Sequence, residues 1–563
     1  MKRFLFLIPM LMIMTVTAHS QQTIIPAGNV SGTWTAAGSP YLIQGSITVP
    51  ANSTLNIEPG VEVNFLGNYF LTVNGFLQAL GTVTDSIHFK SSTGYWGGII
   101  FSDAPDSSHL NYCILDSMNC VLAPVVSVNS NPVISHCTIM HNNGMLDCGG
   151  ISLKNNSNAR IMYCTISYNH GNNTYGGGII IEDSNPEIFQ CSIIGNSCAT
   201  GYGGGIYIAG GNPLISQSTI AENNANHGSG LYVDTGGSLI LRSSTLSHNH
   251  GNQQGGGIVI SSSTGVINLD KCMVIANTSA TGGSGIHIVD ADSVVITASL
   301  FESNSNGNQE GAIYSANCTR LIIDHCDFVK NMIFDTFMAS GGITLNGNTN
   351  LTLRNSIFKG QAGSNIDFRS YLSASVSYCD FEFGYEPFNF PPSGLGAITT
   401  VNANGDPCDV FYNIYLDPLF VDYTLGDYHL TENSPCIDAG DPSMPNDPDG
   451  TVNDMGGFYF HQDIPTWIER DASKITEGYT LYQAYPNPFN SVTTINFDLP
   501  EISNATLLIY NGSGKIVFEK IYGKLDPGRY EYIWDAFNMS GGVYFYRLRT
   551  DKSDITKKMI LLK

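Results

Sequence analysis

The central part of this sequence places its apolar residues in short alternating groups. One run has Ile179 and Ile181, then Ile188, then Cys191 and Ile193, with polar residues or glycine between the groups. Alternation over so few positions predicts β-strands that bury one face. No stretch of this region offers the ten or so residues of helical spacing that helical repeats need. We therefore expect short strands joined by tight turns.

The alternating groups recur with a fixed period. A Cys or Ser position, followed five residues later by Asn, occurs eight times at intervals of 26 to 28 residues. Such a period is the signature of a solenoid or a similar array. Three short strands per period fit one coil of a parallel β-helix, with successive coils about 4.8 Å apart. The two columns are Cys137, Cys164, Cys191, Ser218, Ser244, Cys272, Ser299 and Cys326, and Asn142, Asn169, Asn196, Asn223, Asn249, Asn277, Asn304 and Asn331.

Stacking of the coils accounts for the residue types in these columns. Inward Cys, Ser and Ile side chains pile up on their own kind, and each Asn side chain can hydrogen-bond the Asn of the coils above and below. Both columns are therefore interpreted as structural, with the cysteines acting as small buried hydrophobes. The expected fold class is all-β: a right-handed parallel β-helix with coils of about 27 residues, followed by a small immunoglobulin-like β-sandwich.

Residues 1–20 are predicted to be a secretory signal peptide. Lys2 and Arg3 precede an apolar run from Phe4 to Val16, and small residues follow it. This run is too short to be a membrane span, and no later stretch approaches the ~18 apolar residues that a span requires. We expect an exported chain that does not cross a membrane.

Residues 21–101 are expected to form an N-terminal cap and the first coils, and residues 102–400 to form the body of the β-helix. An open end of a solenoid exposes strand edges that invite aggregation. The segment that contains Trp34, Pro40 and Tyr41 is expected to cover that edge.

Residues 401–462 are expected to close the β-helix. Their strings DPLFVD, DYHLTENSPCIDAGDP and NDPDGTVNDMG resemble the closing segment of secreted β-helix proteins of the choice-of-anchor type. The acidic residues Asp447, Asp449 and Asp454 leave two interpretations open, a calcium site or a capped acidic turn. Their spacing is not that of an EF-hand loop.

Residues 463–477 are polar, lack the repeat and are interpreted as a linker. Residues 478–563 then show six strands with turn signals between them, which predicts a small sandwich. The strings YPNPFN, WDAFN, GGVYFYRL and KKMILLK resemble the type A C-terminal sorting domain of the type IX secretion system. The resemblance implies the type IX machinery as a partner, export across the outer membrane of a Gram-negative-type bacterium, removal of this domain and attachment at the cell surface.

The composition narrows the possible partners. The chain has 24 Lys and Arg against 47 Asp and Glu, a formal charge of −23, which argues against nucleic acid as a partner. The 13 cysteines are odd in number, so at least one thiol stays free unless it pairs between chains. Cys408 and Cys436 stand outside the stacked column and are the best candidates for a disulfide. We expect a monomer.

One segment invites an enzymatic interpretation. Asp324, His325 and Asp327 lie in the string IDHCDF, which resembles the WIDHC stretch of pectate lyases with Ile in place of Trp. The string is also this coil's version of the repeat. Lyase chemistry further needs a base near a bound uronate, and the central coils contain few basic residues. The three residues are therefore weak catalytic candidates.

A binding interpretation rests on the positions that follow each glycine run. If residues there alternate inward and outward, Tyr207, Tyr232, His287 and Tyr314 face solvent as one stripe on a single sheet. Sugars or a partner protein could stack on such rings, and ordinary packing under neighbouring loops is the alternative.

The expected function is a secreted, surface-anchored scaffold that is adhesin-like or glycan-binding, with an extracellular glycan or a surface protein as its partner. The alternative is a polysaccharide lyase or glycoside hydrolase that acts on an extracellular polysaccharide. Calcium is the one cofactor that the residues suggest.

Overall fold

The computed structural model describes residues 22–172, 175–307, 310–333, 340–382, 387–462, 478–489, 492–512, 514–536, 539 and 541–562. The predicted signal peptide and the predicted linker at 463–477 lie outside the described residues. The chain divides into two compact units, residues 1–460 and residues 461–563. The described part holds no helix with the length and apolarity that spanning a bilayer would take.

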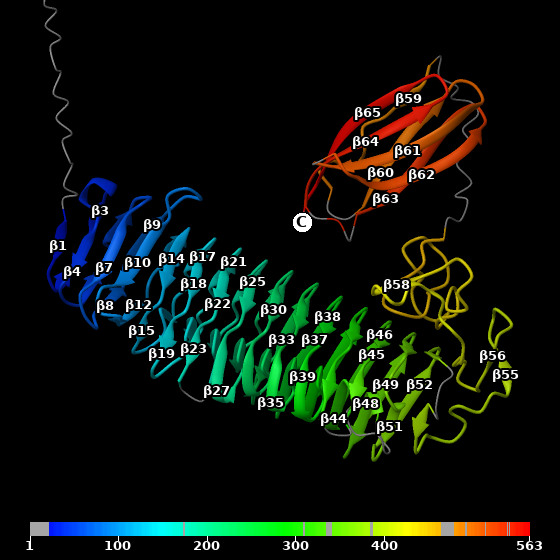
Figure 1. The fold of residues 1–563 in the computed structure, drawn as a ribbon, viewed down its shortest axis with the longest axis horizontal. Helices are drawn as coiled ribbons and strands as arrows, with labels where there is room; N and C mark the ends of the chain where they lie inside the picture. Colours follow the sequence, from blue (N-terminus) through cyan, green and yellow to red (C-terminus); the bar gives the residue numbers. More distant parts are fainter. Residues whose placement is uncertain are drawn as a thin grey trace, which may run out of the picture. The chain divides into compact units, whose positions relative to one another are not determined.

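The first unit is a parallel β-helix whose coils stack in chain order (Figure 1). Sheets A and B have 15 strands each, sheet C has 14 and a short sheet D has 10. One coil shows the order of the sheets: β22 (Thr165–Ser167) in sheet A, β23 (His170–Gly171) in sheet D, β24 (Ile179–Glu182) in sheet B and β25 (Glu187–Phe189) in sheet C. The sequence predicted three strands per coil, and the strands of sheet D, which have two to six residues, are a fourth.

Sheets B and C run the length of the solenoid beside sheet A, and sheet D accompanies them in the middle coils. Sheet B begins with β2 (Gly28–Asn29) and ends with β54 (Phe388–Asn389), sheet C runs from β3 (Gly32–Trp34) to β52 (Ser373–Ser377), and sheet D from β11 (Tyr95–Trp96) to β47 (Met332–Ile333). Sheet A consists of β1 (Thr23–Ile25), β4 (Tyr41–Ile43), β7 (Glu62–Phe65), β10 (Ile87–Ser91), β14 (Cys113–Asp116), β18 (Thr138–Met140), β22, β26 (Ser192–Ile194), β30 (Thr219–Ala221), β34 (Thr245–Ser247), β38 (Met273–Ile275), β42 (Leu300–Glu302), β46 (Asp327–Val329), β50 (Ile357–Lys359) and β53 (Asp380–Phe381).

The predicted Asn column forms a continuous hydrogen-bonded ladder inside the solenoid. From Asn142 to Asn304, each Asn donates through Nδ2 to Oδ1 of the Asn in the next coil at 2.9–3.2 Å. These side chains are at most 1% exposed, so every polar atom must find its partner within the stack. The Cys and Ser column is buried as well, and its cysteines are free thiols. The structural interpretation of both columns is confirmed.

The N-terminal end of the solenoid differs from the expectation. The segment with Trp34 and Tyr41 does not cover a strand edge, because Trp34 belongs to β3 of the first coil and Tyr41 begins β4 (Tyr41–Ile43) of the second coil. The rings of Trp34 and Tyr41 stack at 4.7 Å and are buried against the apolar core.

The C-terminal end is covered by chain that follows the last coils. Asn413 takes the place of the next coil's Ser, because its Oδ1 accepts from the backbone N–H of Cys379 at 3.0 Å. Leu395 and Tyr415 complete the apolar core at this end. The core is therefore sealed by residues 387–415.

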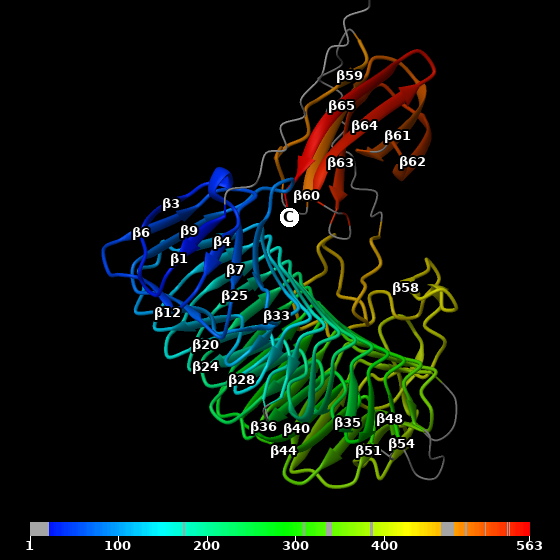
Figure 2. The ribbon, with the colours of Figure 1, turned by 60° about the vertical axis from the view of Figure 1, so that its left-hand side comes forward.

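The remaining part of the closing segment, residues 416–460, lies over the outward face of sheet A in the last coils (Figure 2). It contains β57 (Phe420–Asp422) and β58 (Asp427–Leu430). A second apolar cluster forms there, with Leu300, Val329 and Ile357 of sheet A packed against residues such as Phe420, Tyr428 and Met455. The same sheet therefore packs on the solenoid core with one face and on the closing segment with the other.

The second unit is the predicted small β-sandwich. One sheet consists of β59 (Thr480–Leu481), β60 (Val492–Leu499) and β63 (Gly528–Asp535), and the other of β62 (Ile516–Leu525), β61 (Ser503–Asn511), β64 (Gly542–Thr550) and β65 (Asp554–Leu561). All neighbouring strands are antiparallel. Trp534 and Tyr546 lie at the centre of its core, which confirms the predicted fold class of this module.

Candidate functional site

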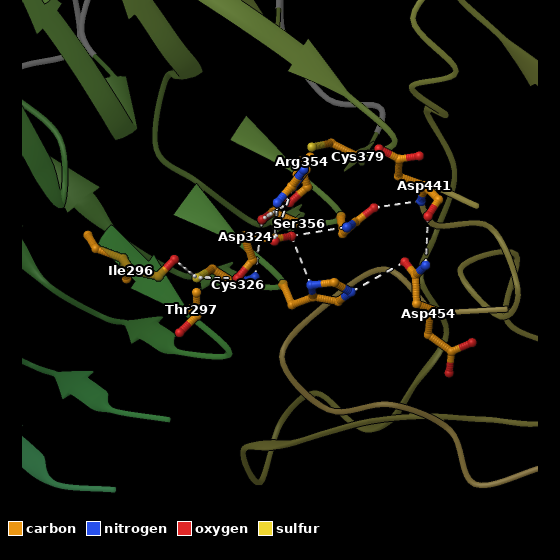
Figure 3. Close-up of polar contacts among 12 residues, drawn as sticks. Ile296, Thr297, Asp324, Cys326, Arg354, Ser356, Cys379, Asp441 and Asp454 are labelled. Atoms are coloured by element: carbon orange, nitrogen blue, oxygen red, sulfur yellow. Dashed lines mark hydrogen bonds and ion pairs between the residues drawn. The ribbon is translucent and has the colours of Figure 1, made fainter. Parts of the chain in front are cut away.

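The weak catalytic candidate Asp324 is the centre of a buried polar network (Figure 3). Its carboxylate accepts hydrogen bonds from Arg354 Nε and Asn355 Nδ2, both at 3.0 Å, and lies 2.8 Å from His325 Nδ1. Burial raises the pKa of Asp324, but the hydrogen bonds and charges of His325 and Arg354 outweigh that effect and hold it below its usual value. The carboxylate is thus stabilised as an anion.

The same network fastens the closing segment to the solenoid. His325 Nε2 lies 3.3 Å from Asn453 Oδ1, and Asn453 Nδ2 donates to the backbone oxygen of Asp441 at 2.8 Å. The backbone N–H of Asp441 donates in turn to Asn355 Oδ1 at 2.8 Å, which closes the ring of contacts. Both imidazole nitrogens of His325 are occupied by protein, so the arrangement is suited to holding the chain together.

Asp327, the third catalytic candidate, is buried beneath the closing segment. Its Oδ2 accepts from the backbone N–H of Gly457 at 2.9 Å, while Oδ1 has no hydrogen-bond partner. Burial raises the pKa of Asp327 to about 7. Two strands later in sheet A, Asp380 accepts from Leu416 N–H at 3.0 Å, and burial raises its pKa to about 8. The three candidates from the string IDHCDF therefore do not converge on one open pocket.

The acidic residues of the predicted calcium loop are occupied by backbone donors. Asp447 Oδ2 accepts from Asp454 N–H, Asp454 accepts from the N–H groups of Asp438 and Phe460, and Asp449 Oδ1 accepts from Thr451. Burial raises the pKa of Asp447 to about 6 and that of Asp454 to about 7. Over the described residues, no three His, Cys, Asp or Glu side chains are placed to hold a metal ion. These backbone contacts are those of a capped acidic turn, and the calcium site stays a prediction.

The predicted disulfide partners Cys408 and Cys436 are free thiols in the structure. Both are buried in the apolar cluster between the closing segment and the solenoid. Cys436 Sγ donates to Asp380 Oδ2 at 3.3 Å, so its thiol serves as a hydrogen-bond donor to a buried carboxyl group.

The predicted aromatic stripe is buried. Tyr207, Tyr232, His287 and Tyr314 are 4%, 7%, 4% and 9% exposed, although they point away from the core of the solenoid as expected. The glycine runs explain the burial, because the chain folds back over sheet B after each strand of sheet D. At Gly282, for example, an added Cβ would collide with the His287 ring. The expectation of a solvent-facing stripe is therefore wrong, and these rings pack in an outer layer between sheets B and D.

Exposed aromatic rings occur instead at the two corners that flank sheet A. We call the stacked residues Tyr112, His136 and Tyr163, between sheets C and A, the first corner row, with ring centroids 4.6 and 4.9 Å apart. The second corner row, between sheets A and D, is His141 and Tyr168, with centroids 5.6 Å apart. Tyr163 is 44% and Tyr168 55% exposed. The rings stack along the solenoid, so their edges and hydroxyl groups face outward.

Between the corner rows lies an outward face of sheet A that the closing segment does not cover. We call the outward face of β14, β18, β22, β26, β30 and β34 the open strip. It carries a row of hydroxyl side chains in register, Thr138, Thr165, Ser192, Thr219 and Thr245. Each of them is half-buried or exposed. The second outward row begins with Asp116 in β14, which lies 3.1 Å from His141 Nδ1, and its residues in the next strands, from Met140 on, are uncharged. The open strip is therefore a polar surface that carries few charges, and aromatic rings bound it in the coils of β14, β18 and β22.

In the last coils, where the closing segment covers sheet A, side chains of the sheet and its corners bind side chains of that segment. Lys330 Nζ lies 4.3 Å from the ring centroid of Tyr423 in the closing segment, and Lys359 Nζ lies 2.5 Å from Oδ1 of Asp417 in the same segment. Gly360 leaves space for the Tyr423 hydroxyl, which an added Cβ would meet. The face of sheet A and its corners thus form a docking surface that the chain itself uses in the last coils.

The sequence did contain a signal for the corner rows. Their members directly precede the Cys position or the Asn position of the repeat, as Tyr163 precedes Cys164 and Tyr168 precedes Asn169. Both tyrosines adopt left-handed backbone, with φ of 57° and 53°. A left-handed backbone is uncommon for a residue with a bulky side chain. Here it marks a turn residue whose side chain points away from the adjoining strand.

Comparison with known proteins follows the same division of the chain. Residues 483–562 match the family model described as secretion system C-terminal sorting domain. Residues 118–214 and 149–328 match the model described as right handed beta helix region. A stretch of 55 residues, 10% of this chain, is 46% identical to the Drosophila melanogaster protein named Protein bark beetle and spans 2% of that protein's length. No solved structure matches the chain.

These matches confirm the right-handed β-helix and the type IX sorting domain that the sequence predicted. A sorting domain of this kind directs secretion to the cell surface or the extracellular space and is recognised by the secretion machinery.

Proposed function

Because the chain is a right-handed β-helix that ends in a type IX sorting domain, we propose that it is an adhesin-like, glycan-binding protein of the cell surface. The proposed binding site is the open strip between the two corner rows. One observation carries the proposal: the outward face of sheet A, which the closing segment covers in the last coils, is exposed from β14 to β34 and lined with hydroxyl groups and aromatic rings.

The chemistry of the open strip favours an uncharged glycan. Its regular row of Thr and Ser side chains offers donors and acceptors to sugar hydroxyl groups. The aromatic edges of Tyr163 and Tyr168 supply apolar contact and phenolic hydroxyls on either side. A net charge of −23 opposes the approach of polyanions such as pectate or alginate. We therefore expect neutral polysaccharides to bind more tightly than acidic ones.

The alternative function is cleavage of an extracellular polysaccharide. Such chemistry needs a pair of groups that can donate and accept protons beside the bound sugar. Asp324, His325 and Asp327 are occupied by, or buried beneath, the closing segment. No observation on the described residues favours the alternative, and binding remains the proposal.

The test is a binding panel on the purified chain. Neutral β-glucans and mannans are compared with pectate and alginate, each with and without calcium. The proposal expects retention on at least one neutral glycan with no product released. Unsaturated-product absorbance or new reducing ends would support the enzymatic alternative, and absence of binding to every glycan would refute the glycan proposal.

A further inference from the structure

The first coil of the solenoid has an unpaired side. In β1, the backbone N–H of Thr23 donates to Pro40 O at 3.0 Å, and the carbonyl of Ile25 accepts from Gln44 N–H at 2.9 Å. Alternate residues of a strand direct their backbone groups to opposite edges. The N–H and C=O of Ile24 therefore point away from β4, and this residue is 57% exposed.

The other two sheets begin in the same way. Gly28 and Val30 donate to the next coil at 3.1 and 2.8 Å, so the backbone groups of Asn29 point to the open side of β2. The carbonyl of Trp34 accepts from the next coil at 2.9 Å, which leaves Thr33 on the open side of β3. Within the part of the chain that the structure describes, no strand pairs with this side of β1, β2 or β3.

The core of the solenoid is covered at its C-terminal end and only partly covered at its N-terminal end. At the C-terminal end, Leu395, Asn413 and Tyr415 continue the stack and bury the core. At the N-terminal end, the inward residues Ile25 and Val30 stay only partly buried, whereas the equivalent residues of inner coils are fully buried. Unpaired backbone groups and an incompletely covered core together form a surface suited to continuing the sheets.

The charge pattern indicates what occupies this end. Proteins commonly protect an open edge with charged side chains. Residues 22–57 contain no Asp, Glu, Lys or Arg, in a chain with a net charge of −23. A second copy of the chain can therefore approach the first coil with little like-charge repulsion. The first coil also carries no charged side chain that would attract an oppositely charged partner.

We propose that two copies of this protein join head to head through their first coils. A two-fold axis places β1 antiparallel to β1 of the second copy and β2 beside β3. Ile24 then exchanges both backbone hydrogen bonds with Ile24 of the other copy, and Asn29 does so with Thr33. This is the hydrogen-bonded pair of an antiparallel ladder.

The small contact area makes this dimer weak. Strands of two or three residues bury far less than the ~800 Å² per partner of a standard interface. The first coil is the end of the solenoid opposite to residue 460, where the chain continues to the sorting domain. Many weak contacts of this kind between displayed copies amount to a homophilic adhesive surface.

Sedimentation velocity of the chain between about 1 and about 100 μM tests the proposal. We expect reversible dimers, with the dissociation constant raised about ten-fold or more by Ile24→Pro, which removes the outward N–H without touching the bonds to β4. Ile24→Lys should weaken the dimer as well. The control Leu80→Lys places the same charge at an exposed position of an inner coil and should leave the dimer unchanged.

A chain that stays monomeric over this range overturns the proposal, as does a dimer that both Ile24 variants leave intact. A circular dichroism spectrum and melting curve equal to those of the parent chain show that a monomeric variant is still folded. Glycan binding through the open strip is independent of this contact and should persist in every variant.

Discussion

Gly195 lies against the ring of Tyr168, and a Cβ at residue 195 would come within 2.5 Å of Tyr168 Cε1. The backbone at Gly195 is left-handed, with φ of 66°, but His141 and Glu222 adopt the same conformation in the same column with φ of 53° and 56°. The backbone alone therefore does not require glycine there. The neighbouring ring accounts for it, as the hydroxyl of Tyr423 does at Gly360.

Gly195→Ala should therefore act on binding through Tyr168. The added methyl group pushes the ring out of the second corner row, and glycan retention should fall several-fold while the fold persists. The left-handed backbone adds a stability cost of about 1 kcal/mol. Titration of the variant with the best neutral glycan measures the effect. Glu222→Ala, one coil further along the same column, is the matched control, and equal affinities for the two variants would contradict the role of the corner row.

Asn223→Ala should destabilise the solenoid more than any substitution on its surface. Asn223 Nδ2 donates to Ile193 O and Asn249 Oδ1, both at 3.0 Å, and its Oδ1 accepts from Asn196 N–H at 2.9 Å. Truncation leaves several buried polar groups without partners, at a cost of about 3 kcal/mol or more. Chemical denaturation gives the change in free energy of unfolding. The exposed Asn252→Ala should stay within about 0.5 kcal/mol of the parent chain, and a similar loss in both variants would argue against the ladder.

The closing segment should be held more firmly in acid than in base. Burial raises the pKa of Asp327 from 3.8 to about 7 and that of Asp380 from 3.8 to about 8. Between pH 3.8 and these raised pKa values, both carboxyl groups stay protonated while the closing segment is docked on sheet A and lose their protons when it is released. The resulting stabilisation of the docked segment is complete below pH 3.8 and is lost as the pH rises through 7 to 8. Asp324 has a lowered pKa and acts in the opposite sense, and its contribution is lost only in acid.

Hydrogen exchange of residues 416–460, corrected for intrinsic rates, measures this effect at about pH 5 and about pH 9. Protection of the Gly457 N–H, which donates to Asp327, should fall at the higher pH. Asp327→Asn cannot ionise and should flatten the dependence. Protection that increases toward pH 9 would show that the sign is wrong.

Removal of residues 478–563 should prevent surface display. The sorting domain is the part of the chain that the secretion machinery recognises, so the truncated protein should accumulate in the periplasm. Cell fractionation and protease accessibility of whole cells give the location. The full chain with Tyr163→Ala is the control for correct display, and surface display of the truncated chain would contradict the sorting role.

The regular columns made the solenoid predictable from sequence. Asn196 and Cys191 recur at a fixed spacing because each coil repeats the same inward contacts, and the Asn ladder confirms that interpretation. Sheet D was not predictable in this way. A strand as short as His170–Gly171 is too brief to show alternation, and its pairing depends on the neighbouring coils.

Because the sequence did not predict sheet D, it also led to the wrong expectation that the aromatic stripe faces solvent. Alternation correctly directed Tyr207 away from the core, but it could not reveal that the chain folds back over that face. Asp324 and His325 likewise acquire their partners from Asn453, 128 residues after His325, which no local pattern indicates. The exposed rings of Tyr163 and Tyr168 belong to turn positions, where the repeat leaves the side chain free to vary.

The double variant Tyr163→Ala/Tyr168→Ala is the sharpest test of glycan binding at the open strip. It removes one exposed ring from each corner row, and Tyr95→Ala, which removes a ring that is 51% exposed on sheet D, is its control. Isothermal titration with the neutral glycan that the parent chain retains gives the affinity of each. We expect at least a ten-fold loss of affinity for the double variant, roughly the contribution of two aromatic contacts, and parent-like affinity for the control. Parent-like binding by the double variant would contradict a binding site on the open strip.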